Sequence, residues 1–549
     1  TLRGMEAVGV EVEVEIAGGL FSISIVGLPD AAVRESKERV RAALRSLDMA
    51  VRGRVAVNLA PADLPKEGAV LDLPIAIGIA SAMGRLPSVP RGIFLGELAL
   101  DGRLRGVRGA VGAAILARDT GVPLFAPADN AEEISLVRGC EAYSVESLDA
   151  LFACFRGERS LPPVSERGPE EERARPEPDF ADIRGQAGAK RALEIAAAGH
   201  HNILLIGSPG SGKTLLARAL RGILPPLSHE ELLEVTLVRS TLGLPFERGL
   251  TPPFRSVHHT ASTASVCGGG SNLRPGEVSL AHRGVLFLDE FPEFRRDLVE
   301  GLRQPLEDGV ITVSRASGSA LYPCRVLLVV AANPCQCGWE GDPVERCVCS
   351  GAELERYHRK ISGPILDRID LHVSVPRLLP RELVAVEESG GESSEVIAER
   401  VRAAREVQRD RWASLGFTCN AELPERVVKR SLALSAEVRP FLSSMAGFAF
   451  SPLLPRVAAG AAPGTSKAPN LIETENALPG AIDWQLTRVR ADDSGFRSPW
   501  IEGYCSKQSV EAGQTLDIMV STNPPRPYTL EIFRMGYYGG RGARLMMTL

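Results

Sequence analysis

The sequence predicts an α/β protein made of two successive α/β domains, followed by a smaller segment of all-β character. Strand-like alternation and helix-like spacing follow one another over residues 1–155 and again over residues 180–434. Beyond residue 470 only short alternating stretches with turn residues remain. A single core stops growing at about 250–300 residues. A chain of 549 residues is therefore expected to hold several domains.

Composition is typical of globular proteins, with 44% hydrophobic and 24% charged residues. The net charge of −5 gives no bulk signature of nucleic-acid binding. A ring or channel can still hide a basic surface inside a near-neutral total. No apolar run reaches the roughly 18 residues that a membrane span needs, and no signal peptide is visible. We therefore expect a cytoplasmic protein with no membrane partner.

The first region, residues 1–155, is expected to form one compact domain. Residues 10–16 alternate apolar and acidic side chains with period two, which is typical of a half-buried strand. Asp30 is placed to cap a helix whose apolar residues recur at helical spacing from Val33 to Leu44. This mixture of elements predicts an α/β fold for the region.

Two segments are predicted to be linkers. Residues 156–179 are rich in proline, glutamate and arginine, and residues 451–469 are rich in alanine, proline and glycine. Neither composition is suited to burying a core, so flexible connections are expected. Residues 470–549 then form the β-rich segment.

Residues 202–214 carry the strongest motif in the chain. A short apolar strand leads into G-x-x-x-x-G-K-[ST], and a helix follows. That context predicts a nucleotide-binding loop with ATP and Mg²⁺, whereas the alternative is a structural glycine-rich turn. Backbone N–H groups would wrap the phosphates, Lys213 would reach the β- and γ-phosphates, and Thr214 would ligate Mg²⁺. The candidate residues are Gly207, Ser208, Pro209, Gly210, Ser211, Gly212, Lys213 and Thr214.

Two further apolar strands end in polar residues. Val285–Leu288 is followed by Asp289 and Glu290, of which the first can hold Mg²⁺ and the second can polarise the attacking water. A third strand ends at Asn333, which would position water beside the γ-phosphate. The alternative for Asn333 is a cap on the turn before Pro334. Parallel strands deliver their carboxyl ends to one sheet edge, where such folds bind ligands, and this favours the functional role.

Four of the ten cysteines lie directly after Asn333, as two C-x-C pairs with nine residues between them. Structural zinc, free thiols and disulfides all remain open as interpretations. Zinc is favoured because four thiolates suit tetrahedral coordination, whereas a reducing compartment disfavours disulfides. Such a site would brace an insertion and perform no chemistry. The four residues are Cys335, Cys337, Cys347 and Cys349.

The order of these motifs resembles that of the YifB/ComM family of magnesium-chelatase-like AAA+ ATPases. The resemblance covers about residues 1–434. The stretches that carry it are DIRGQ, the phosphate loop, PFRSVHHTASTASVCGGGSNLRPGEVSLAHRGVLFLDE, LRQPLEDGVITVSR, VAANPCQCG and GPILDRIDLHV. It implies an AAA+ core at residues 180–376, a helical lid at residues 377–450 and a bacterial homo-hexamer.

The family resemblance also implies a function. It implies an ATP-driven DNA motor, a helicase that drives branch migration during natural transformation. The alternative is a chelatase-like chaperone that remodels a metal-inserting partner. Arg368 becomes the expected arginine finger toward a neighbouring subunit, whereas a surface salt bridge is the other interpretation.

In this family the N-terminal segment is similar to the proteolytic domain of Lon. Lon-type peptidases carry a serine within P-K-D-G-P-S-A-G, and the matching stretch here is PKEGAVLD, residues 65–72. Val70 stands at the serine position, and no lysine lies between Lys66 and Lys190. A Ser–Lys dyad needs an alcohol and a basic amine, so we expect a domain without proteolytic activity.

The end of the chain departs from the family pattern. After Met445 the expected R-x-Y-H-R helix is missing, which predicts a truncated lid. Residues 470–549 resemble the N-terminal β-rich part of the large subunit of N,N-dimethylformamidase-like proteins. They hold no recognisable catalytic set. This pattern predicts a fusion of two unrelated fragments.

Overall fold

The computed structural model describes two compact units, Thr1–Ser431 with Ser451–Ala458, and Leu432–Phe450 with Ala459–Leu549. No helix within the described ranges is both long enough and apolar enough to cross a membrane. The described residues are 1–168, 178–269, 273–315, 318–361, 365–378, 391–424, 426–428, 501–505, 518–522, 531–535 and 543–548.

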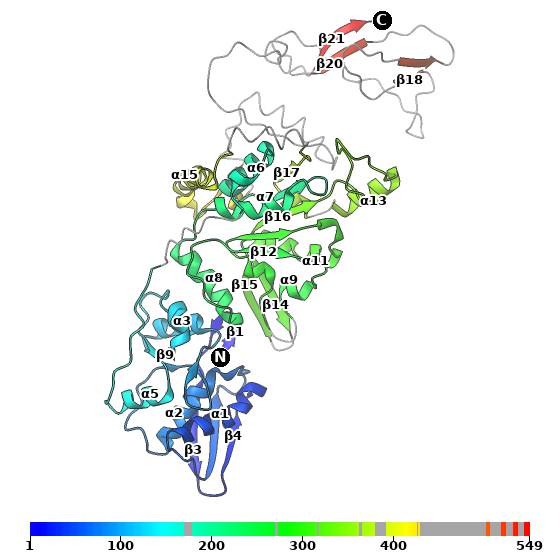
Figure 1. The fold of residues 1–549 in the computed structure, drawn as a ribbon. Helices are drawn as coiled ribbons and strands as arrows, with labels where there is room; N and C mark the ends of the chain where they lie inside the picture. Colours follow the sequence, from blue (N-terminus) through cyan, green and yellow to red (C-terminus); the bar gives the residue numbers. More distant parts are fainter. Residues whose placement is uncertain are drawn as a thin grey trace. The chain divides into compact units, whose positions relative to one another are not determined.

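The N-terminal region of the first unit is an α/β domain (Figure 1), as the alternating sequence predicts. Strand β5 (Arg54–Ala60) lies between β3 (Glu11–Ala17), which is antiparallel to it, and β4 (Ser22–Val26), which is parallel. Helix α2 (Asp72–Ala82) packs against β3, and α1 (Ala31–Ser46) packs against α2. The backbone N–H of Val33 donates to the carboxylate of Asp30 at 2.8 Å, so Asp30 caps α1 as predicted.

A second sheet of the same domain has the order β10 (Ala142–Val145), β9 (Leu124–Pro127), β6 (Ile93–Phe94). Helix α3 (Ala110–Thr120) packs against β9, and α5 (Leu148–Phe155) against β10. Residues 161–164 run beside β10. Leu161 is buried, and the Val164 N–H donates to Ala142 O at 2.8 Å. The prediction of a flexible linker does not hold for these residues, since Leu161 anchors them. Residues 169–177 of the predicted linker lie outside the described residues.

The second region of this unit is built on five parallel strands. Their order is β12 (Phe254–Val257), β13 (Val285–Leu288), β16 (Leu327–Ala332), β11 (Ile203–Ile206), β17 (Leu371–Ser374). Successive residues of the central strands enter two different cores: Leu286 and Leu328 belong to one, Phe287 and Val329 to the other. Burial on both faces explains why these strands read as continuous apolar runs.

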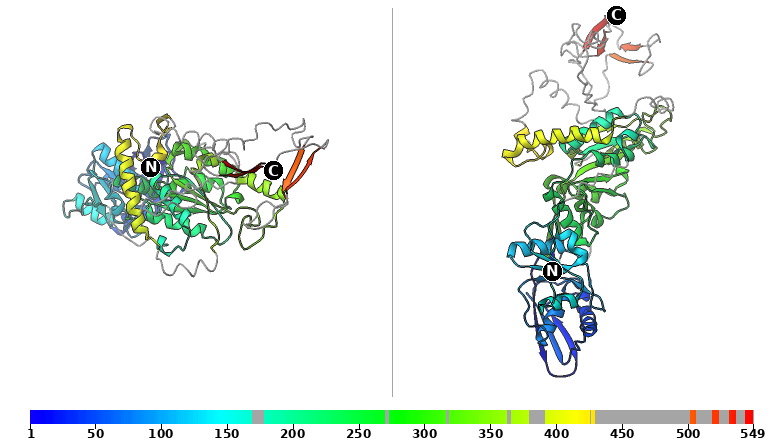
Figure 2. Two further views of the ribbon diagram at one scale, coloured as in Figure 1. Left: turned by 90° about the horizontal axis from the view of Figure 1, so that it is seen from above. Right: turned by 60° about the vertical axis from the view of Figure 1, so that its left-hand side comes forward.

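Helices cover both faces of this sheet (Figures 1 and 2). Helix α6 (Ala187–Gly199), α7 (Lys213–Ala219) and the long α15 (Ser394–Trp412) contribute to one core, and α15 packs along α6. The other core receives α9 (Thr263–Cys267), α10 (Glu277–Leu280), α11 (Arg296–Gly301) and α13 (Gly351–Ile361). Helix α12 (Arg303–Asp308) leads into the hairpin β14 (Val310–Arg315) and β15 (Gly318–Pro323). Helix α8 is His229–Leu242.

The described part of the second unit consists of two antiparallel strand pairs. These are β18 (Ile501–Cys505) with β19 (Ile518–Thr522), and β20 (Glu531–Met535) with β21 (Ala543–Thr548). They agree with the β-rich character predicted for residues 470–549. The predicted end of the lid near Met445 and the linker 451–469 lie outside the described residues. Of the lid predicted at 377–450, the structure describes α15 and the short turns that follow it.

Candidate nucleotide site and cysteine cluster

The predicted phosphate loop joins β11 to α7. Its first residue, Gly207, has no room for a side chain, because a Cβ there would lie 2.1 Å from the carbonyl oxygen of Val375. Gly210 and Gly212 have φ values of +77° and +93°, which favour glycine. The Ser211 Oγ is buried, and no described group hydrogen-bonds to it. A loop that keeps an unpaired buried hydroxyl and tightly turned glycines fits a phosphate ligand.

The Lys213 side chain is buried inside the loop. Its Nζ donates to the carbonyl oxygens of Gly207 at 2.7 Å and Ser208 at 3.0 Å, and to Asn333 Oδ1 at 3.2 Å. Burial lowers the pKa of the Lys213 ammonium. The structure therefore brings Asn333, at the end of β16, to the same point as the loop lysine, although 120 positions separate them.

Thr214 and Asp289 are the two residues that the sequence predicts as Mg²⁺ ligands. The Thr214 hydroxyl donates to Asp289 Oδ2 at 2.8 Å, while Asp289 Oδ1 accepts the backbone N–H of Glu290 at 2.9 Å. A hydroxyl and a carboxylate side by side are hard oxygen ligands, which suit Mg²⁺. The pair lies where β11 and β13 deliver their carboxyl ends.

Glu290 follows Asp289 with a left-handed backbone, at φ +53°. Its carboxylate Oε2 lies 3.1 Å from His259 Nδ1, and the Glu290 side chain is 58% exposed. His259 was not predicted from the sequence. It stands just beyond β12, the strand beside β13, so the signal was a polar residue at the end of a fourth parallel strand.

Arg368 lies away from this group. It ends a short turn before β17, and Leu371 N donates to Asn202 O at 3.0 Å, at the start of β11. The phosphate loop leaves the opposite end of β11, about 13 Å away for a four-residue strand. Within its own chain Arg368 Nε donates to Glu307 Oε1 at 2.8 Å.

Gln186 is a further contact that sequence reasoning did not assign. Its side-chain amide donates to Ser211 O at 3.2 Å and to Pro376 O at 2.6 Å. The residue therefore ties the phosphate loop to the segment after β17. Gln186 belongs to the DIRGQ stretch, which is one of the motifs of the family resemblance. The sequence predicts no chemical role for that stretch.

The four cysteines predicted as metal ligands come together. Their sulfur atoms all lie within 4.8 Å of one another, and Cys335 is fully buried. Cys335 Sγ lies 3.3 Å from Cys337 Sγ and 3.7 Å from Cys347 Sγ. Disulfide sulfurs stand about 2.05 Å apart, so these four are thiols. Sulfurs around tetrahedral zinc, at about 2.3 Å from the metal, are separated by roughly 3.8 Å. The cluster, which is completed by Cys349, is a candidate metal site.

The N-terminal domain has no Ser–Lys dyad at the positions that match Lon. Val70 packs against the domain core, and the fully buried Lys66 donates to the carbonyl oxygen of Pro61. Nearby, the buried Asp72 accepts from Arg39 Nε at 2.6 Å and from the Leu98 N–H at 3.1 Å. These contacts give the matching stretch a structural role in the described domain.

Comparisons with known proteins agree with this architecture. Family models for the magnesium chelatase subunit ChlI match residues 12–130 and 179–383, and a model of the ChlI C-terminal part matches residues 391–449. The competence protein ComM of Haemophilus influenzae is 41% identical over 434 residues, which is 78% of this chain and 85% of that protein. The chain belongs to the YifB/ComM family of magnesium-chelatase-like AAA+ proteins.

Other YifB/ComM relatives match over a similar length. An uncharacterized protein of Mycobacterium tuberculosis is 43% identical over 448 residues, covering 79% of this chain and 87% of the relative. YifB of Escherichia coli, also uncharacterized, is 40% identical over 447 residues, covering 79% and 85%. None of these matches supports the resemblance of residues 470–549 to dimethylformamidase, and the family models end at residue 449.

Proposed function

We propose that this protein is an ATP-hydrolysing motor of the YifB/ComM type that acts as a hexamer on DNA. The observation that carries the ATPase is that two residues of the phosphate loop meet the polar ends of two neighbouring strands: Lys213 contacts Asn333 after β16, and Thr214 contacts Asp289 after β13. The ATPase class also agrees with membership of the AAA+ family. The DNA substrate is supported by the similarity to the competence protein ComM.

In this proposal each residue has one role toward ATP and Mg²⁺. The loop N–H groups and the Lys213 ammonium bind the phosphates, and Thr214 with Asp289 holds the metal. When bound, Mg²⁺ neutralises charge on the phosphate oxygens. Glu290 accepts a proton from water as general base, and Asn333 orients that water.

Arg368 is assigned to the nucleotide of a neighbouring subunit. Arg368 lies near the amino ends of the strands, whereas the phosphate loop of the same chain lies at their carboxyl ends. This distance supports a role toward a neighbouring subunit. There the guanidinium would stabilise charge that develops on the transferred phosphoryl group. In a closed ring, such as the homo-hexamer proposed here, every such arginine would meet a neighbouring site.

The deciding experiment measures ATP turnover of the assembled protein with no DNA, with single-stranded DNA and with forked DNA. We expect DNA to stimulate turnover with little sequence preference. The affinity for DNA should fall steeply with salt, because phosphate contacts depend on counterion release. Turnover that does not change with any DNA, in an assembled ring, would contradict the DNA motor.

The second candidate is an ATP-dependent chaperone that remodels a metal-inserting partner. It is supported by a match to the magnesium-chelatase 67 kDa subunit of Chlorobaculum parvum, 30% identical over 159 residues. That match covers 28% of this chain and 23% of the relative, so it supports the chaperone less than ComM supports the DNA motor. Stimulation of the ATPase by a protein partner, with none by DNA, would favour it.

We also propose that the four-cysteine site holds a structural zinc ion. Four thiolates leave no ligand position open, so the ion would brace the chain and take no part in hydrolysis. Metal analysis of protein purified under reducing conditions should give about one zinc per chain. Absence of metal, together with free alkylation of all four native thiols, would contradict this assignment.

A further inference from the structure

The segment between the two cysteine pairs, residues 338–346, lies against the phosphate loop. Gly338 has φ +87°, and a Cβ built on it would lie 2.7 Å from Pro209 Cδ and 2.8 Å from Pro209 Cγ. A few residues on, the neighbouring Ser208 side chain holds the pKa of the Asp342 carboxyl below its ordinary value, while the buried Asp342 Oδ2 accepts no hydrogen bond from any described group. The segment therefore packs against Pro209 of the phosphate loop and lies beside Ser208.

This segment is also fixed from within and from behind. Asp342 Oδ1 accepts the N–H groups of Val344 and Glu345, both at 2.9 Å, which folds the tip into a tight turn. Behind it, Tyr357 on α13 donates its hydroxyl to Asn333 O at 3.1 Å. His358 Nε2 lies 3.1 Å from Glu340 Oε2. The loop is therefore held between α13 and the phosphate loop.

The two ends of the segment are the cysteine pairs themselves. A metal ion bound by all four thiolates would tie Cys335 and Cys337 to Cys347 and Cys349. Closing a loop at its ends removes most of its alternative conformations. Without the metal, the two ends of the segment would be untied, and contacts such as those of Glu340 with His358 and of Trp339 with Arg377 would have to keep it beside Ser208 and Pro209.

We propose that the metal in the four-cysteine site sets the nucleotide affinity of the phosphate loop, by holding residues 338–346 against Ser208 and Pro209. The carbonyls of Gly207 and Ser208 accept from Lys213 Nζ. A shift of this turn would therefore move both the lysine and the N–H groups that receive phosphate. The inference rests on the proposed nucleotide binding and on zinc as the occupant, and it concerns binding rather than hydrolysis.

The first test removes the metal. Zinc-loaded full-length protein is titrated with a fluorescent ATP analogue, then stripped with a chelator under reducing conditions, and then reloaded with zinc. We expect affinity to fall about fivefold or more on stripping and to return on reloading, roughly 1 kcal/mol at that fold-change. Cys347→Ser should lose zinc and show the same loss. Cys154→Ser, in the N-terminal domain, should change neither quantity.

The second test keeps the metal and breaks only the contact. Gly338→Ala inserts a methyl group against Pro209, whereas Gly341→Ala adds one where nothing lies within 4 Å. Both glycines have positive φ, +87° and +74°, so the two variants carry a comparable backbone penalty. We expect both to retain about one zinc per chain and only Gly338→Ala to lose nucleotide affinity.

The outcomes separate the inference from the proposed function. If stripped protein and Gly338→Ala both bind nucleotide like the wild type, the inference is overturned and the ATPase proposal stands. A zinc-loaded wild type that binds no nucleotide would overturn both. If Cys347→Ser fails to fold, judged by circular dichroism, the pair of glycine variants still decides the matter.

Discussion

At the scale of single residues, the proposed site depends on a division of work between binding and chemistry. Lys213 Nζ already lies within 2.7–3.2 Å of three oxygen acceptors, so its replacement removes the positive charge at the centre of the loop. We expect Lys213→Ala to abolish nucleotide binding.

Glu290→Gln should bind nucleotide normally and lower turnover by about a hundredfold or more, because the general base is lost. Equilibrium binding and steady-state ATPase assays check the two variants. Normal turnover by Glu290→Gln would show that another group is the base.

His259 is the residue-scale feature that only the structure revealed. Its Nδ1 lies 3.1 Å from the carboxylate of Glu290, a side chain that is otherwise mostly exposed. Loss of this partner frees the carboxylate to adopt other rotamers, so we expect His259→Ala to lower kcat roughly threefold to tenfold with KM unchanged. His258→Ala is the matched control, because the His258 ring packs beside His259 and contacts Thr260. An unchanged kcat for His259→Ala would rule out a positioning role.

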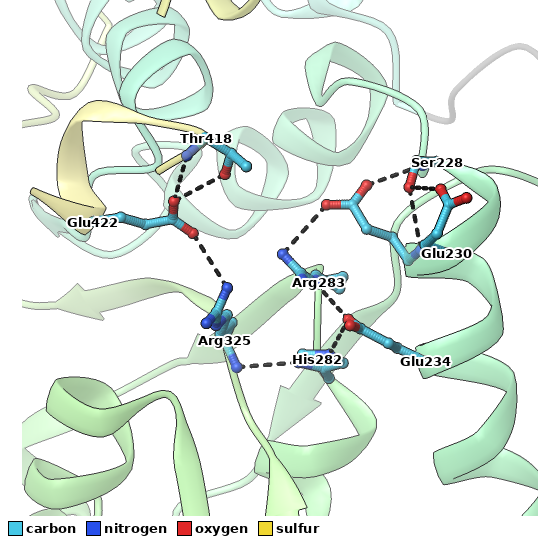
Figure 3. A network of polar contacts seen from close by, with 9 residues as sticks. Ser228, Glu230, Glu234, His282, Arg283, Arg325, Thr418 and Glu422 are labelled. Atoms are coloured by element: carbon cyan, nitrogen blue, oxygen red, sulfur yellow. Dashed lines mark hydrogen bonds and ion pairs between the residues drawn. The ribbon is translucent and has the colours of Figure 1, made fainter. Parts of the chain in front are cut away.

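At the scale of elements, a polar network joins α8, the turn before β13, the segment before β16 and the residues after α15 (Figure 3). The buried His282 is at its centre: Nδ1 accepts the Arg325 N–H at 3.1 Å, so Nε2 carries the proton toward Glu234 at 3.0 Å. Arg283 also donates to Glu234, and Glu422 pairs with Arg325 at 3.6 Å. The network therefore requires a neutral His282.

This network predicts a dependence of stability on pH. Burial lowers the pKa of His282 below its ordinary value of 6.5, so the folded state disfavours its protonation. The stabilisation is complete above pH 6.5, and it is lost as the pH falls below that value. Stability should therefore be lower at pH 5.5 than at pH 7.5. Chemical denaturation at pH 7.5 and 5.5 measures it. His282→Gln should unfold more easily at pH 7.5 but lose less stability between the two values. An equal loss in both proteins would exclude His282 as the source.

Some of these structural elements could be predicted from the sequence alone, and others could not. The apolar strands and the phosphate loop were predicted, because burial on both faces and the need for positive φ leave local signals. Leu161 was hidden in a proline-rich stretch, and no local pattern shows that it packs beside β10. The contact of Gly338 with Pro209 joins residues far apart in the chain, so it required the folded structure. The cysteine cluster could be predicted only in part. The spacing of the cysteines suggested a metal site, but only the structure shows that all four sulfur atoms lie close together.

At the scale of the whole molecule, the central question is whether Arg368 serves its own chain or a neighbour. In its own chain it pairs with Glu307, at the sheet edge opposite the phosphate loop. If the arginine acts in trans, a ring that mixes Lys213→Ala with Arg368→Ala subunits regains some complete sites. Each of those sites combines an intact loop from one subunit with an intact arginine from the next.

We expect each variant alone to be inactive and a randomly mixed one-to-one assembly to recover up to about a quarter of wild-type turnover, because half of the loops and half of their neighbouring arginines are intact. The ATPase rate across a series of mixing ratios measures this, with size-exclusion chromatography to follow assembly. Glu307→Gln is the control, since it breaks the pair within the chain and leaves the arginine in place. If Glu307→Gln abolishes turnover as fully as Arg368→Ala, and mixing restores nothing, Arg368 acts through that salt bridge and the nucleotide site must be completed by another group.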